Sequence, residues 1–180
     1  FASLTGADVA ASVNDTGHAI YDGDWNLEYE WGDVETKVAF SGSVQQQWHN
    51  LLAVLTVSTT DDVLDGTTTT IADLIAAPGP DGFISLREAI IATNNTAGAD
   101  EIILPAGTYT LAIGGIGEDA AATGDLDITD ELTIQGSGAA TTVIDGGGLE
   151  RVLDITLSGD ANITGVTLQN GGNVTQGGGV

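Results

Sequence analysis

The segment LTIQGSGAATTVIDGGGLERVLDITLSG (132–159) decides the fold that the sequence predicts. Short runs of apolar and β-branched residues alternate in it with glycine-rich breaks, and the pattern continues through NITGVTLQNGG (162–172). Each run is too short for a self-sufficient hairpin sheet, but it can pair with an equivalent strand one coil away, at about 4.8 Å. The pattern therefore predicts a solenoid, with Ile, Leu and Val inside and Gly or Asn at tight corners.

The same pattern extends to both sides of this segment. EIILPAGTYTLAI (101–113) and LDI (126–128) precede it, and VTQGGGV (174–180) ends the sequence in mid-coil. We therefore expect the first coil near Glu101 and an incomplete coil at the C-terminal end.

A repeat period can be read by aligning similar segments. Ile134, Ile155 and Val180 then fall at equivalent positions, with a drifting spacing in the range of repeat proteins. A β-sandwich with glycine-rich loops is the alternative fold. The regular strand lengths and the near absence of bulky aromatic residues after Tyr109 favour the solenoid.

A helix is predicted directly upstream, in DGFISLREAI (81–90). Ser85 and Glu88 have the S-x-x-E spacing of a capping box, in which each side chain satisfies an amide at the helix start. An open solenoid end exposes unpaired backbone groups, so we expect a helix over 85–95 to cover it. Arg87 should pair with a nearby carboxylate or with backbone carbonyls of the first coil. The predicted structural cap consists of Ser85, Leu86, Arg87, Glu88 and Ile90.

The first part of the chain has a different pattern. ADVAAS (7–12) and DWNLEYE (24–30) read as strands, VETKVAF (34–40) as the second strand of a hairpin, and 44–55 as a helix that gives way to β character. IADLIAA (71–77) is a short helix candidate in a connector rich in Asp, Thr, Gly and Pro. The predicted organisation is a small α/β segment (1–58), a linker (59–84) and a capped β-helix (85–180).

Charge and composition restrict the setting. The net charge is -23, which opposes binding to nucleic acid and to anionic lipid surfaces. Cysteine is absent, and no apolar run is long enough to insert into a membrane. Methionine is absent as well, so we expect this chain to be a processed piece or a fragment of a longer one. A saline or calcium-rich exterior would relieve the self-repulsion, although simple solubility also explains the acidity.

Several motifs, taken in order, resemble one bacterial family. SLREAI (85–90), DEIILPAGTYTL (100–111), GEDAAATGDLDI (117–128), LTIQGSG (132–138) and VIDGGG (143–148) look like right-handed parallel β-helix proteins that carry an N-terminal "CSLREA" segment. This resemblance implies a large secreted or surface polypeptide. Ile84 stands where that family has its cysteine, which removes any thiol role and keeps an apolar contact.

A second resemblance concerns the N-terminal part. LTGADVAAS (4–12) and DWNLE (24–28) are similar to the closing part of a domain of unknown function found near the N-termini of long bacterial adhesin-like proteins.

Acidic residues suggest metal sites in the chain. The densest group in the solenoid surrounds GEDAAATGDLDITDE (117–131), where Asp125 and Asp127 are expected on the outer face of a strand. Ca²⁺ binds six to eight oxygen ligands, so Asp119, Asp125, Asp127 and Asp130 are candidates. A less favoured set lies on one face of the strand 24–30 and just before it: Asp22, Asp24, Asn26 and Glu28. Solvated polar faces are the alternative for both.

DGFISLRE (81–88) also copies the second half of an EF-hand loop. The earlier ligand positions fall on Ala77 and Gly79, which offer no carboxylate. A turn that leads into a capping box explains the same residues and is the favoured interpretation.

An enzymatic role is not indicated by any catalytic constellation. Lys37, Arg87 and Arg151 are the only cations, so an acidic polysaccharide would find few partners. His18 and His49 lie outside the solenoid, and an Asp145–Asp154 carboxylate pair on neighbouring coils is a weaker option than outward-facing side chains.

The sequence thus predicts a mainly β chain, a right-handed parallel β-helix with a capping helix, preceded by a small α/β segment. We expect a non-enzymatic structural or adhesive module of a bacterial surface or matrix protein. It could form homo-oligomers or fibres through β-edge contacts, and it could bind Ca²⁺ and a glycan or surface receptor. A fragment of a β-helical polysaccharide lyase or glycosidase is the alternative.

Overall fold

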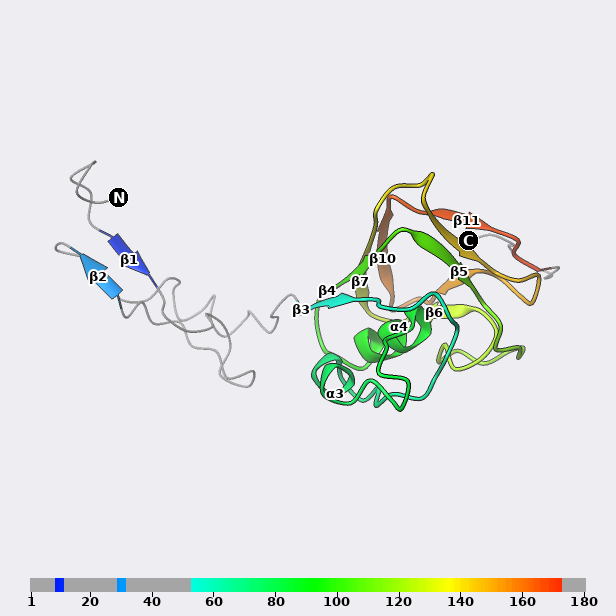
Figure 1. Ribbon diagram of the computed structural model, residues 1–180, viewed down its shortest axis with the longest axis horizontal. Helices are drawn as coiled ribbons and strands as arrows, with labels where there is room; N and C mark the ends of the chain where they lie inside the picture. The colour runs from blue at the N-terminus through cyan, green and yellow to red at the C-terminus, as the bar shows by residue number, and fades with distance from the viewer. Residues whose placement is uncertain (1–8, 12–28, 32–52, 173–180) are drawn as a thin grey trace. The chain divides into compact units, whose positions relative to one another are not determined.

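The computed structural model describes residues 9–11, 29–31 and 53–172 (Figure 1). The chain divides into two compact units, Phe1–Leu51 and Leu52–Val180. In the first unit, β1 (Val9–Ala11) pairs antiparallel with β2 (Tyr29–Trp31). Both strands were predicted, whereas the hairpin strand predicted over 34–40 lies outside the described residues.

The second unit is mainly β, and its strands pair in parallel. Its helices in the described range are α3 (Ile71–Ala76) and α4 (Leu86–Asn94), and neither has the length and apolarity needed to cross a bilayer. Its strands are β3 (Ala53–Thr56), β4 (Asp100–Leu104), β5 (Gly107–Thr110), β6 (Leu126–Ile128), β7 (Glu131–Gly136), β8 (Thr142–Asp145), β9 (Leu153–Ile155), β10 (Asp160–Thr164) and β11 (Thr167–Gln169).

These strands form parallel sheets that the chain visits in turn. The orders are β10-β7-β4-β3, β11-β8-β5 and β6-β9. After β4 the chain passes through β5 and β6, one in each of the other sheets, before it returns to the first sheet at β7. Figure 1 shows β5 and β11 in one layer and β10 and β7 in another. A sandwich of antiparallel neighbours is therefore wrong for this unit.

Apolar side chains stack in register across the strands. Ile102, Ile134 and Ile163 are direct partners on β4, β7 and β10. The first two are fully buried, and Ile163 packs partly buried against the same core. The spacing is about 30 residues, within the range of repeat architectures.

The repeat alignment that matched Ile134 with Ile155 is wrong. Ile155 pairs with Ile128 on β6, in a different sheet from Ile134. Strands of all the sheets share the same short apolar pattern, so local similarity alone does not reveal which of them pair.

The parallel sheet begins earlier than Glu101. β3 pairs with β4, and Leu55 lies opposite Ile102, with both side chains buried. β3 thus belongs to the compact unit Leu52–Val180, together with the strand that it pairs with. Leu55 is in a strand and does not continue the helix predicted over 44–55, the rest of which is mostly outside the described residues.

The corners are built from residues with positive φ, as the sequence predicted. Gly165 follows β10 with φ +67°, and a Cβ there would run into the carbonyl of Gly136, the last residue of β7. Asn170 follows β11 with φ 52°. These corners let adjacent turns of the chain approach closely, which only glycine or a residue that tolerates the left-handed region permits.

Candidate functional site

The N-terminus of α4 has a complete capping box. The Ser85 hydroxyl accepts a hydrogen bond from the Glu88 amide at 3.2 Å, and the Glu88 carboxylate accepts one from the Ser85 amide at 2.9 Å. Glu88 also accepts from the amides of Asp65 and Gly66, at 2.8 and 2.7 Å. Ser85 donates to the Val63 carbonyl at 2.6 Å. The capping box thus starts the helix and also binds the loop between β3 and α3 to it.

Arg87 is fully buried, and it contacts both kinds of partner expected from the sequence. Its Nε lies 2.7 Å from Asp62 Oδ1, and its Nη2 lies 3.0 Å from Asp62 Oδ2. The guanidinium also donates to the carbonyls of Ala121, Gly124 and Asp125. The Arg87 side chain therefore connects α4 to the loop between β3 and α3 and to the loop that leads into β6.

Asp62 completes this network. Its Oδ2 accepts hydrogen bonds from the amides of Ala112 and Ile113, at 2.7 and 2.9 Å. Burial opposes ionisation of Asp62, but the Arg87 guanidinium and the two amides outweigh it, so its pKa lies below the usual value of 3.8. Asp62 is consequently charged, and the buried arginine is neutralised.

A second polar cluster arises from a repeated tripeptide. Leu-Asp-Ile occurs in β6 and again in β9, and these strands pair in parallel with Asp127 directly opposite Asp154. The loop before β6 adds Asp119. One carboxylate oxygen from each of Asp119, Asp127 and Asp154 lies within 4.8 Å of the others.

Asp127 is the buried member of this cluster. Its side chain is fully buried, and its Oδ2 accepts from the Ala121 amide at 2.7 Å. Its Oδ1 is buried without a hydrogen-bond partner. Burial raises the pKa of Asp127 to about 7, with Asp125, Glu118 and Asp154 adding repulsion. An ionised Asp127 therefore needs a counter-charge that its immediate surroundings do not supply.

The predicted metal residues separate into different roles. Asp125 is bound by Arg151, with Nε 2.7 Å from its Oδ2, and Arg151 Nη2 also reaches Asp154 at 2.9 Å. Asp130 accepts from the Glu131 amide. The structure thus groups Asp119 and Asp127 of the predicted set with Asp154, whose candidacy as a cation ligand the sequence analysis missed.

Asp125 and Asp127, expected on the outer face of a strand, are not on a solvent-exposed face. Both are buried, at 1% and 0% exposure. α4 packs against β6, where Asn94 donates to the Asp127 carbonyl and accepts from the Thr129 amide. The loop before β6 also folds back, through Ala121, so that β6 is covered on both faces.

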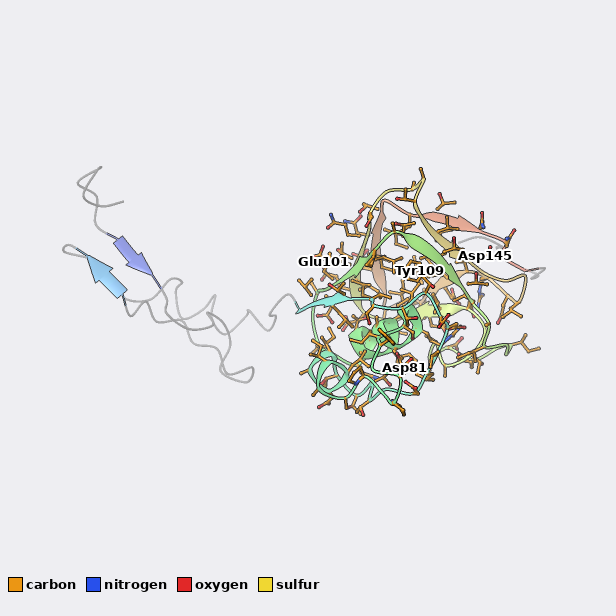
Figure 2. All side chains as sticks on the ribbon, viewed as in Figure 1. Asp81, Glu101, Tyr109 and Asp145 are labelled. Atoms are coloured by element: carbon orange, nitrogen blue, oxygen red, sulfur yellow. The ribbon has the colours of Figure 1, made fainter. Side chains whose placement is uncertain are left out.

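The remaining candidates do not form a site in the described residues. Asp81 caps a local turn by accepting from the Phe83 amide, and Glu88 is occupied by the capping box, so the EF-hand resemblance has a structural explanation. Asp145, at the end of β8 (Figure 2), accepts from Gln169 and Asn170, while Asp154 is held by Arg151. Asp22, Asp24, Asn26 and Glu28 lie outside the described residues.

The comparisons with known proteins concern the first unit. DUF4347, a domain of unknown function, matches residues 1–52. This match agrees with the resemblance of the N-terminal part to a domain of unknown function. The matched residues correspond closely to the first compact unit, Phe1–Leu51. No curated protein and no solved structure matches the chain.

Proposed function

We propose that the chain is an extracellular structural or adhesive module of a bacterial surface or matrix protein, built on a right-handed parallel β-helix. The observation that carries this proposal is the in-register stacking of parallel strands in three sheets that the chain visits in rotation. A stack of this kind can be extended by further strands, which is a property of a scaffold.

The capping helix supports this assignment. α4 places Leu86, Ala89 and Ile90 in the core, and α3 lies beside it. Glu88 binds a backbone amide of the loop between β3 and α3, and Arg87 binds a carbonyl of the loop before β6, which supports a cap over the apolar side chains at this end. A capped end of a sheet stack resists nonspecific pairing of its strand edges with other chains.

The opposite end offers a surface for self-assembly. Among the described residues, β10 and β11 each pair with a strand on one side only. Ile163 and Leu168 there are only partly buried, whereas their partners Ile134 and Ile144 are fully buried. Leu157, in the turn after β9, is fully exposed. We propose that a second copy of this chain covers these residues and extends the sheets.

Light scattering after size exclusion, with electron microscopy of the same fractions, tests the assembly. The chain should form dimers or longer particles as its concentration rises. Leu157→Asp should shift the distribution to monomers, because it places a charge in the proposed contact. Ile75→Asp is the matched control, since Ile75 is an exposed apolar residue on α3. A chain that stays monomeric at all concentrations, or an equal response in both variants, would refute this arrangement.

The N-terminal strand is less suited to self-association by donating itself to the sheet of a second chain. The segment ADVAAS (7–12) could in principle add to a neighbour's sheet as an extra strand, but its residues Val9–Ala11 pair with β2. Donation would require that pair to open. We therefore assign the self-association to the exposed end of the second unit.

The extracellular setting and the ligand are part of the same proposal. The charge of -23 suits a cation-rich exterior, and a glycan or surface receptor is the expected partner.

Fluorescence imaging of the producing cells with an antibody against residues 53–172 tests the location. Surface or matrix staining supports the assignment, and exclusively internal staining contradicts it. A carbohydrate-active enzyme would instead release reducing ends from a polysaccharide.

A further inference from the structure

We propose that Asp119, Asp127 and Asp154 form a binding site for Ca²⁺. The site is built by the pairing of β6 with β9, which sets Asp127 opposite Asp154, and by the loop that brings Asp119 over them. It is independent of the proposed function, since it depends only on these three side chains and their neighbours.

The buried oxygen of Asp127 is the observation that points to a ligand. Oδ2 already accepts from the Ala121 amide, which leaves Oδ1 without a donor at a fully buried position. A buried acceptor without a partner costs roughly 1–3 kcal/mol, and more when it is charged. A cation beside Oδ1 would remove this cost.

The charge balance of the cluster leads to the same conclusion. Arg151 is the basic residue that the structure places here, and it contacts Asp125 and Asp154. One carboxylate oxygen from each of Asp119, Asp127 and Asp154 still lies within 4.8 Å of the others, and Glu118 is close enough to raise the pKa of Asp127. A divalent ion at this point would offset the repulsion between the carboxylates.

The geometry suits Ca²⁺ without large rearrangement. Oxygens bound to one Ca²⁺ at about 2.3–2.6 Å lie at most about 5 Å apart, and the three carboxylate oxygens are within 4.8 Å of one another. Asp119 is exposed and borders a hollow of about 170 Å³ beside Asn94 and Thr129. Water in this hollow can therefore reach the Asp119 side of the cluster and supply a ligand there. Mg²⁺ demands a smaller, near-octahedral site and fits this spacing less well.

Thermal unfolding of the full chain tests the site. The chain is treated with EDTA, dialysed, and melted with increasing CaCl₂ at constant ionic strength. A ligand that binds only the folded state raises Tm, by about 5–10 °C at 100-fold excess over Kd. Asp127→Asn should abolish the Ca²⁺ shift. Without Ca²⁺ this variant should melt at or above the Tm of the unaltered chain, because it removes a buried charge.

Two further variants keep the test decisive. Asp119→Asn changes an exposed residue, so it should fold normally and weaken Ca²⁺ binding at least tenfold in titration calorimetry. Asp130→Asn is the matched control, since Asp130 lies outside the cluster, and it should keep the full Ca²⁺ shift. The proposal is overturned if millimolar Ca²⁺ leaves Tm unchanged. It is equally overturned if Asp119→Asn and Asp127→Asn respond to Ca²⁺ as the unaltered chain does.

Discussion

Arg87 and Asp62 form a buried ion pair that joins three separate parts of the second unit. The side chains are 0% and 3% exposed, with Nε and Oδ1 2.7 Å apart. Arg87 further binds carbonyls before β6, and Asp62 binds amides after β5. The pair therefore fixes loops that local hydrogen bonds alone would leave less constrained.

Removal of the arginine should destabilise the chain strongly. Arg87→Met leaves the Asp62 carboxylate buried and the carbonyls of Ala121 and Gly124 without their donor. Loss of one member of a buried pair costs about 3–5 kcal/mol. Urea unfolding followed by circular dichroism measures the loss. Arg151→Met is the comparison: it leaves the buried Asp125 without its partner, but Arg151 itself is 25% exposed and solvent screens its ion pairs, so the loss should be smaller. Equal losses in the two variants would contradict the role given to the buried pair.

The same pair predicts an acid-dependent loss of stability. The pKa of Asp62 is lower in the folded chain than its usual value of 3.8, so its contribution is present above about pH 4. It disappears as the pH falls through the lowered pKa, because the folded state must then take up a proton at a site that favours the charged form. The difference in unfolding free energy between the unaltered chain and Asp62→Asn should therefore shrink below pH 4. A difference that stays constant from pH 6 to pH 2.5 would contradict this.

The stack of isoleucines predicts a graded response to truncation. Ile134 is fully buried between Ile102 and Ile163, so Ile134→Ala should cost about 2–5 kcal/mol. Ile163→Ala should cost less than half as much, because Ile163 is only partly buried at the end of the stack. Chemical unfolding of both variants, below the concentration at which the chain associates, gives the comparison. An Ile163→Ala cost equal to or above that of Ile134→Ala would place Ile163 inside a completed core.

The local elements of this fold were predictable from the sequence. The S-x-x-E spacing located α4, and the glycine-punctuated apolar runs located most strands after residue 100. Each of these features depends on residues only a few positions apart. Helix capping and the alternation of apolar and polar residues are local effects, so both can be recognised in a single sequence.

The pairing of the strands was harder to predict. Ile134 and Ile155 have similar neighbours, yet they belong to different sheets, because loops of unequal length separate the strands. β3 was assigned to the preceding segment because a long connector with two helices separates it from its partner β4. Asp154 was missed as a partner of Asp127, although the repeat of Leu-Asp-Ile at 126–128 and 153–155 was a usable signal. The burial of Asp127 was not predictable, since it depends on a loop and a helix distant from β6 in the sequence.

Cross-linking between β7 and β10 tests the central claim, the parallel in-register stacking, most directly. Gln135 and Thr164 are direct partners with exposed side chains, and the chain has no cysteine of its own. Adjacent strands lie about 4.8 Å apart, within the range that a disulfide spans. Gln135→Cys with Thr164→Cys should form an intramolecular disulfide on mild oxidation, detected by peptide mass spectrometry of the monomer. The control that pairs Gln135→Cys with Asn162→Cys, two residues out of register, should remain largely reduced. A control that cross-links as readily as the in-register pair, or an in-register pair that stays reduced, would contradict the account.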